Sequence, residues 1–153
     1  YDKPLMDGPS VWGYLTTTLG AQNYTTATEI VLDAEIYDTN SNFSLVTGRF
    51  TPTLAGIYLA IAQGNLSGWT QAADDNTAIE IRKNGSAATG SVVYGRFHQD
   101  AALTTAGEAV AFSIFSMNGS TDYLSMWIQV STDTSVTLSV GSGITHLLVS
   151  RIG

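Results

Sequence analysis

The chain has 153 residues and a net charge of −7, with six Lys or Arg, and charged residues make up 12 % of it. The six cations are scattered, so no basic stripe exists to neutralise phosphates, which argues against binding to nucleic acid or to an anionic membrane. The chain contains no cysteine, which excludes disulfides, thiolate metal sites and cysteine nucleophiles. No apolar run approaches the roughly eighteen residues that span a bilayer.

The length suits a single domain with a hydrophobic core. We predict that this domain occupies residues 11–153. Residues 1–10 are predicted to form an arm or linker, because Pro4, Gly8 and Pro9 interrupt any regular element there. The first residue is Tyr rather than Met, so either a leader was removed or the chain is part of a longer protein.

Apolar and polar residues alternate along most of the chain, and no segment keeps the stripe of a helix. The clearest alternation runs over residues 29–37, where Ile30, Leu32, Ala34 and Ile36 share one face. This pattern predicts one half-buried antiparallel strand. Similar alternation recurs over residues 79–81, 110–114, 124–130, 136–140 and 144–152.

Turn sequences separate these runs at short intervals. Asn84-Gly85 is the strongest, because both residue types tolerate the positive φ angles of a type I′ turn. Residues 118–120 and 141–143 carry comparable signals. Many short strands separated by regular turns are typical of a β-sandwich or a β-barrel.

The run from Phe43 to Ala62 reads FSLVTGRFTPTLAGIYLAIA, with Phe50 six residues before Gly56 and Tyr58 two residues after it. This run resembles the signature stretch of the C1q/tumour-necrosis-factor-like jelly rolls, written TG-x-F-T-x-P-x-x-G-x-Y. The resemblance implies an all-β sandwich of about ten antiparallel strands. It also implies a homotrimer, because domains of this family usually associate around a threefold axis.

Shorter pieces of the chain resemble the same family in the same order. They are Val11–Leu15, Ile30–Asp33, Ile81–Gly85, Asp122–Trp127 and His146–Ile152. Two departures occur: Thr121 stands where the family usually has Gly, and the closing strand lacks the family's Phe and Gly. Within the family, residues 37–58 resemble the C1q-like domains of bacteriophage capsid decorations, head fibres and tail fibres.

The sequence gives little support to an enzyme. A Ser-His-Asp triad would need His98 or His146 beside a serine on a sharp turn, and no G-x-S-x-G motif is present. Asp33, Glu35 and Asp38 could suggest a glycosidase pair. They are explained more simply as outward residues of an edge strand, where charge deters unwanted pairing. We therefore predict that the chain is not an enzyme and needs no cofactor.

Asp74 and Asp75, which are followed by Asn76, are candidate ligands for a cation. Carboxylate and carbonyl oxygens are the ligands that Ca²⁺ prefers. The resemblance allows for calcium as well, since some C1q-like trimers hold it near the trimer axis. The alternative is a solvated acidic loop tip, which fits the absence of any EF-hand spacing.

Four aromatic residues are candidates for contact with a partner. Trp12 and Tyr14 share one face of the first predicted strand, and Trp127 alternates with apolar neighbours in a later strand. In a trimer such aromatics fill the subunit interface more often than they bind a ligand. Trp69 lies in a long stretch without a pattern, residues 63–76, and is the best candidate for contact with an outside partner.

The resemblance implies a non-enzymatic virion structural protein, displayed as a trimeric capsid decoration or head fibre on the particle surface. Its partners would be two further copies and the major capsid protein, which the arm would reach. The alternative is the head of a tail fibre, or another secreted C1q-like binding protein, that attaches to a host-surface glycan or receptor through residues 63–76 and 99–107. A third possibility, an enzyme on a cupin-like scaffold, lacks the expected His-rich metal motif.

Overall fold

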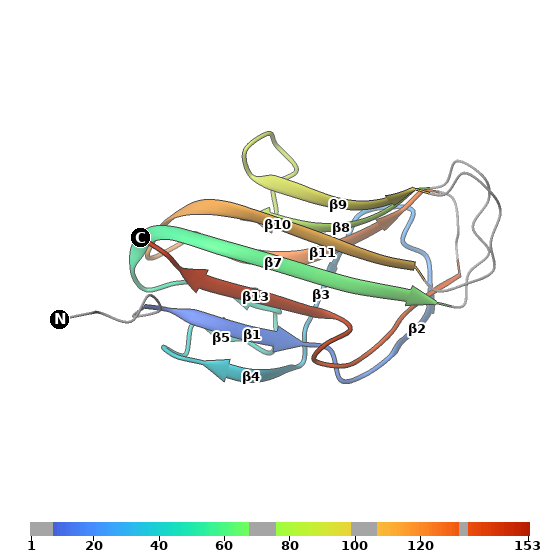
Figure 1. Ribbon diagram of the computed structural model, residues 1–153, viewed down its shortest axis with the longest axis horizontal. Coiled ribbons are helices and arrows are strands. Elements are labelled where there is room, and N and C mark those ends of the chain that lie inside the picture. The colour runs from blue at the N-terminus through green and yellow to red at the C-terminus, as the bar shows by residue number, and fades with distance from the viewer. Residues whose placement is uncertain (1–7, 68–75, 99–106, 132–134) are drawn as a thin grey trace.

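The computed structural model describes residues 8–67, 76–98, 107–131 and 135–153 as two stacked β-sheets, without a helix among them (Figure 1). Every strand pairing within these sheets is antiparallel. The sequence-based prediction of an all-β antiparallel sandwich is therefore confirmed. Among the described residues, no helix is long and apolar enough to cross a membrane.

The first sheet is built around one long strand, β7, which pairs with β10 on one side and with β13 and β12 on the other. Beyond β13, the sheet continues with β1 and then β4. On the other branch, β2 pairs with β12. Its strands are β1 (Ser10–Tyr14), β2 (Leu19–Gln22), β4 (Ala34–Asp38), β7 (Ala55–Ser67), β10 (Gly107–Asn118), β12 (Val136–Leu138) and β13 (His146–Arg151).

The second sheet is arranged in the order β5-β6-β11-β8-β9, and β3 pairs with β11 beside β6. Its strands are β3 (Thr28–Ile30), β5 (Phe43–Ser44), β6 (Arg49–Phe50), β8 (Asn76–Lys83), β9 (Val92–His98) and β11 (Leu124–Val130). The two sheets bury a common apolar core between their facing surfaces.

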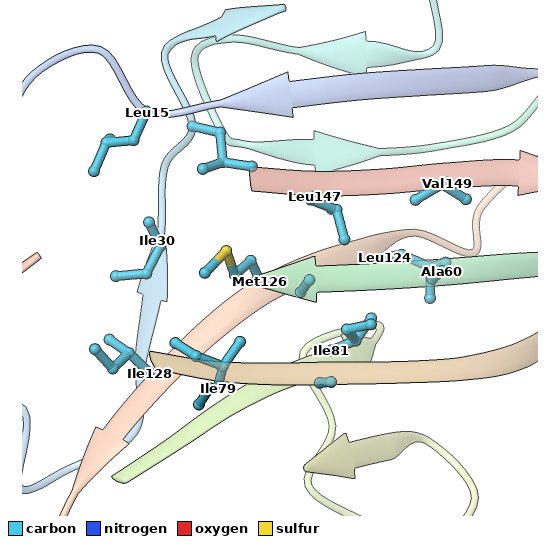
Figure 2. Packing of buried hydrophobic residues seen from close by; sticks show 14 of the residues in the cluster. Leu15, Ile30, Ala60, Ile79, Ile81, Leu124, Met126, Ile128, Leu147 and Val149 are labelled. Carbon is cyan, nitrogen blue, oxygen red and sulfur yellow. The ribbon is translucent and has the colours of Figure 1, made fainter. Parts of the chain in front are cut away.

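Side chains from both sheets meet in this core (Figure 2). Ile79 and Met126 of the second sheet are fully buried, and they reach β7 at Gly64, where an added Cβ would collide with both of them. Fully burying an aliphatic side chain of this size stabilises a fold by about 1.5–3 kcal/mol. The labelled members of the cluster are Leu15, Ile30, Ala60, Ile79, Ile81, Leu124, Met126, Ile128, Leu147 and Val149.

The prediction of one strand over residues 29–37 is wrong. The chain crosses between the sheets in this region, so that β3 belongs to the second sheet and β4 to the first. Asp33 lies in the crossover and accepts hydrogen bonds from Thr16, from the amide N at 2.6 Å and from Oγ1 at 2.9 Å. Ile36, predicted to face the core, is 54 % exposed on the edge strand β4.

The signature run of the sequence forms β6 and the start of β7. Phe50 and Tyr58 are both buried, and their rings meet edge to face with centroids 5.8 Å apart. Gly48 has a φ of +66° and lies so close to the backbone of Ile30 and Val31 that a Cβ would not fit. The turn before β6 therefore requires glycine both for its positive φ angle and for the close approach of this backbone.

Asp122 joins two pieces of the chain that carried the family resemblance separately. Its carboxylate accepts hydrogen bonds from Asn84 Nδ2 and from the amide N of Asn118, each at 2.9 Å, and lies 2.8 Å from Lys83 Nζ. Asn84 Oδ1 in turn accepts from the amide N of Tyr123 at 2.9 Å. Burial alone would raise the pKa of Asp122, but the hydrogen bonds from these groups outweigh it and lower that pKa.

The expected turn at Asn84-Gly85 is present, with φ values of 56° and 67°. Ser86 N donates to Lys83 O at 3.1 Å, as a tight turn requires. The chain does not enter β9 directly, because that strand begins at Val92. The turn thus begins the loop between β8 and β9 and places Asn84 within hydrogen-bonding distance of Asp122.

The predicted arm lies only partly within the described residues. Residues 1–7 fall outside them, so the arm over residues 1–10 stays a prediction. Gly8 O accepts a hydrogen bond from Thr39 Oγ1 at 3.2 Å, and Pro9 O accepts one from Arg151 N at 3.2 Å. These contacts hold the entry to β1 against the body of the first sheet.

We expect Asp122→Ala to lower the free energy of unfolding by about 2–4 kcal/mol, because it removes several hydrogen bonds and leaves the Lys83 ammonium without its carboxylate partner. Urea denaturation followed by tryptophan fluorescence measures the change. Glu35→Ala, an exposed position on β4, is the matched carboxylate control and should cost less than about 0.5 kcal/mol. Equal losses in the two variants would contradict this role for Asp122.

Candidate interaction surface

Strand β10 carries apolar side chains on both of its faces. The inward ones are buried against the second sheet. The outward ones include Val110, Phe112 and Ile114, which are 44 %, 70 % and 58 % exposed. Single exposed apolar residues are common on soluble proteins, but three on one face of one strand form a contiguous patch.

This patch continues across the sheet. Phe112 is paired with Ile61 on β7, Ile61 with Leu148 on β13, and Leu148 with Trp12 on β1. Directly paired residues share a face of the sheet, so these four side chains form one row over four strands. We call this surface the apolar face; it comprises Trp12, Ile57, Leu59, Ile61, Val110, Phe112, Ile114 and Leu148.

The apolar face is hollowed beside β10. Leu59, Phe112, Ser113 and Ile114 line a shallow hollow of about 410 Å³. Its wall is mostly hydrocarbon, because Leu59, Phe112 and Ile114 all lie on the outward side of the sheet. Contact with another apolar surface would lower the free energy of such a surface, which offers few groups to orient a small polar ligand.

Trp12 and Tyr14 lie on the same outward side of β1, as the sequence predicted, and both are half-buried. The Trp12 indole Nε1 donates to Ser142 O at 3.1 Å, which fixes the ring at the border of the apolar face. Tyr14 is paired with His146 of β13. Contact of these aromatics with a partner stays a prediction; Trp12 ends the row of outward apolar side chains that begins at Phe112 on β10.

His146 was expected to be a structural strand residue, and it lies in β13 with 9 % of its surface exposed. Its ring centroid is 5.6 Å from that of Trp12, and its Nδ1 has no hydrogen-bond partner among the described residues. Burial lowers the pKa of His146, and the negative charge of Glu108 on β10 opposes this shift in part. The imidazole is therefore held neutral at physiological pH.

The remaining predicted site residues do not join the apolar face. Trp127 lies on the outward surface of the second sheet, where its Nε1 donates to Ser125 Oγ at 2.9 Å and the Arg82 guanidinium lies 4.3 Å from its ring centroid. Its role in partner binding stays a prediction.

The other expected site residues lie outside the residues that the structure describes. Trp69, Asp74 and Asp75 lie outside the described residues, so the proposals of a partner contact and of a calcium site stay predictions. In the part of the chain that the structure describes, no three His, Asp or Glu side chains gather in a way that could hold a metal ion.

Phe112 and Ile114 were not among the predicted site residues, although the alternation of residues 110–114 predicted a strand there. The missed signal is that small apolar residues, Ala109 and Ala111, fill the other half of the pattern. A half-buried strand alternates apolar with polar residues, whereas this one is apolar on both faces. Such a strand needs a second covering layer.

The comparisons with known proteins give a likeness of structure without a likeness of sequence. No family model and no curated protein matches the chain. Among solved structures, the globular domain of zebrafish complement 1qA is similar with a TM-score of 0.65 at 12 % identity, over 95 % of this chain and 98 % of that one. Murine APRIL at pH 5.0 gives 0.63 at 12 %, over 95 % and 99 %.

A third similar structure is the Eiger TNF of S. frugiperda, with a TM-score of 0.56 at 10 % identity, over 95 % of this chain and 94 % of that one. The three likenesses span almost the whole of each chain. They show that the chain has the C1q/TNF-like jelly-roll fold. At this level of identity they show the fold alone.

We expect the free energy of unfolding to decrease as the pH falls below about 6.5, the ordinary pKa of histidine. The reason is that the unfolded chain takes up a proton on His146 that the folded chain resists, since the folded pKa is lowered. His146→Gln should flatten this dependence between pH 6.5 and pH 5, where carboxylates with ordinary or lowered pKa values remain ionised.

Thermal unfolding across this pH range provides the measurement, with His98→Gln, at the second histidine of the chain, measured in parallel. A dependence that persists unchanged in His146→Gln would contradict the burial of a neutral imidazole at this position.

Proposed function

We propose that the chain is a non-enzymatic module that assembles as a homotrimer through its apolar face. The observation that carries the proposal is the row from Phe112 to Trp12, with Phe112 70 % exposed. Apolar surface left in water costs about 25 cal/mol per Å², so association of copies that covers this row is favourable. C1q/TNF-like folds typically form trimers, which supports the stoichiometry.

The charge on and around the apolar face also supports assembly. Glu108 lies on the outward side of β10, near one end of the face. The other outward positions of β10, β7, β13 and β1 are apolar or neutral, so little charge has to be desolvated when copies associate. In a closed threefold ring the contact is heterologous, so this face meets a different part of the neighbouring copy.

We expect the wild-type chain to have three times the mass of the 16.2 kDa monomer in sedimentation equilibrium. Phe112→Asp should dissociate it to the monomer, because the contact would bury an unpaired carboxylate. The matched control is Val46→Asp, which places the same charge at an apolar residue that is 87 % exposed away from the apolar face. A monomeric wild type, or equal dissociation by both variants, would contradict the proposal.

We further propose that the trimer is a bacteriophage virion protein, displayed as a capsid decoration or head fibre and bound to the major capsid protein. Support comes from the likeness of residues 37–58 to C1q-like domains of phage structural proteins, and from a composition with few charges and no cysteine. The second candidate, the host-binding head of a tail fibre, is favoured by the polar pocket described below.

Co-sedimentation distinguishes these two roles. We expect the purified chain to sediment with bacteriophage particles that lack it and not with bacterial cells of the host. The reverse result, binding to cells without binding to particles, would contradict the decoration role and favour the tail-fibre head. Binding to neither would contradict both.

A further inference from the structure

The outward surface of the second sheet carries a polar pocket of about 170 Å³. This surface faces away from the first sheet and so from the apolar face. The pocket is lined by Asn76, Ala78, Tyr94, Arg96, Gln129 and Ser131. Five of these residues lie on three neighbouring strands, β8, β9 and β11, and Ser131 directly follows β11.

The pocket exists because a small residue lies among large ones. Ala78 of β8 is paired with Gln129 on β11 and with Arg96 on β9, so all three side chains share the outward face. The methyl group of Ala78 is 8 % exposed and forms the floor. The longer side chains of Gln129, Arg96 and Tyr94 surround it as walls, on regular strands rather than on loops.

Arg96 differs from the other arginines on this surface. Arg49 lies 2.8 Å from Glu29, and Arg82 lies 2.6 Å from Glu80, so each has a carboxylate partner. Arg96 is exposed and has no ion pair among the described residues. Its guanidinium lies 5.0 Å from the ring centroid of Tyr94, which holds it at the rim of the pocket.

The walls combine one cation with an aromatic ring and neutral polar groups. A guanidinium matches a carboxylate through two parallel hydrogen bonds. Tyr94, 41 % exposed, offers a flat apolar ring with a hydroxyl at its end. Gln129 is fixed by donation from Nε2 to Thr25 O at 3.2 Å.

From this arrangement we infer that the pocket binds a single sugar ring that carries a carboxylate group, as uronic acids do. The carboxylate pairs with Arg96, and the ring lies over Ala78 and contacts Tyr94. A phosphate would favour several cations, and a drug-sized ligand would need a pocket of about 300–1,000 Å³. A neutral sugar would leave the charge of Arg96 unused.

The pocket and the apolar face lie on different sheets, so sugar binding does not require the trimer. It does not require a virion either, since the lining residues belong to one chain. In a trimer, however, the pocket would be present three times on the outer surface, and this multivalency would raise the avidity of weak single sites.

The test is a titration followed by amide NMR shifts, with two matched pairs of probes. Methyl β-glucuronide and methyl β-galacturonide carry the carboxylate, whereas methyl β-glucoside and methyl β-galactoside do not. We expect at least one uronide to bind about tenfold or more tightly than its neutral partner, which corresponds to one charge-assisted contact. The shifted amides should lie on β8, β9 and β11.

Three variants locate the site. Ala78→Leu fills the floor with a side chain that strands tolerate and should abolish the shifts. Arg96→Gln should bring the affinity for the uronide down to that for the neutral sugar. Arg49→Gln removes the same charge from the same surface at a paired arginine and should leave binding unchanged. The thermal midpoint of each variant reports whether it is folded.

Equal affinity for charged and neutral sugars, or no shift with either uronide, would overturn the inference. Binding that survives in Ala78→Leu would also overturn it. The same holds if acetate binds as tightly as the uronides, because the sugar ring would then contribute nothing to the affinity. A monomeric chain that binds a uronide would uphold the pocket and refute the homotrimer, and a trimer without binding would do the opposite.

Discussion

The antiparallel pairing of β7 with β10 is the constraint on which the rest of the structure depends. All twelve residues of β10 are paired with β7, and the side-chain period of two then decides which face each residue occupies. One face closes the core between the sheets. The other leaves Phe112 and its neighbours exposed. The pairing that closes the core therefore also leaves an apolar surface exposed to solvent in the single chain.

The two outward surfaces differ in a way that suits a displayed module. On the first sheet, apolar residues follow one another from β10 to β1, and His146 is held neutral among them. On the second sheet, arginines stack on aromatic rings at Arg49 and Tyr123, Arg82 and Trp127, and Arg96 and Tyr94. Assembly through the first surface would leave the second facing solvent and able to meet a ligand.

The sequence predicted the fold well because its signals are local. Asn84-Gly85 and the run around Phe50 and Tyr58 depend on a few neighbouring residues, and the structure contains both features. The prediction of one strand over residues 29–37 was wrong because the same alternation suits two strands of different sheets, and the crossover at Asp33 depends on Thr16, distant in sequence. The candidate surfaces depend on register between strands, which no local pattern contains. Phe112 and Ile61, or Ala78 and Arg96, become neighbours only when the sheets form.

Hydroxyl-radical footprinting of the native chain tests most directly whether the apolar face is covered in solution. Phe112 and Tyr94 react readily and are 70 % and 41 % exposed in the single chain, on opposite sheets. If copies cover the apolar face, Phe112 is labelled far less than Tyr94 at concentrations where the assembly forms, and it gains reactivity on dilution. Labelling of Phe112 that equals or exceeds that of Tyr94 at every concentration would contradict the account.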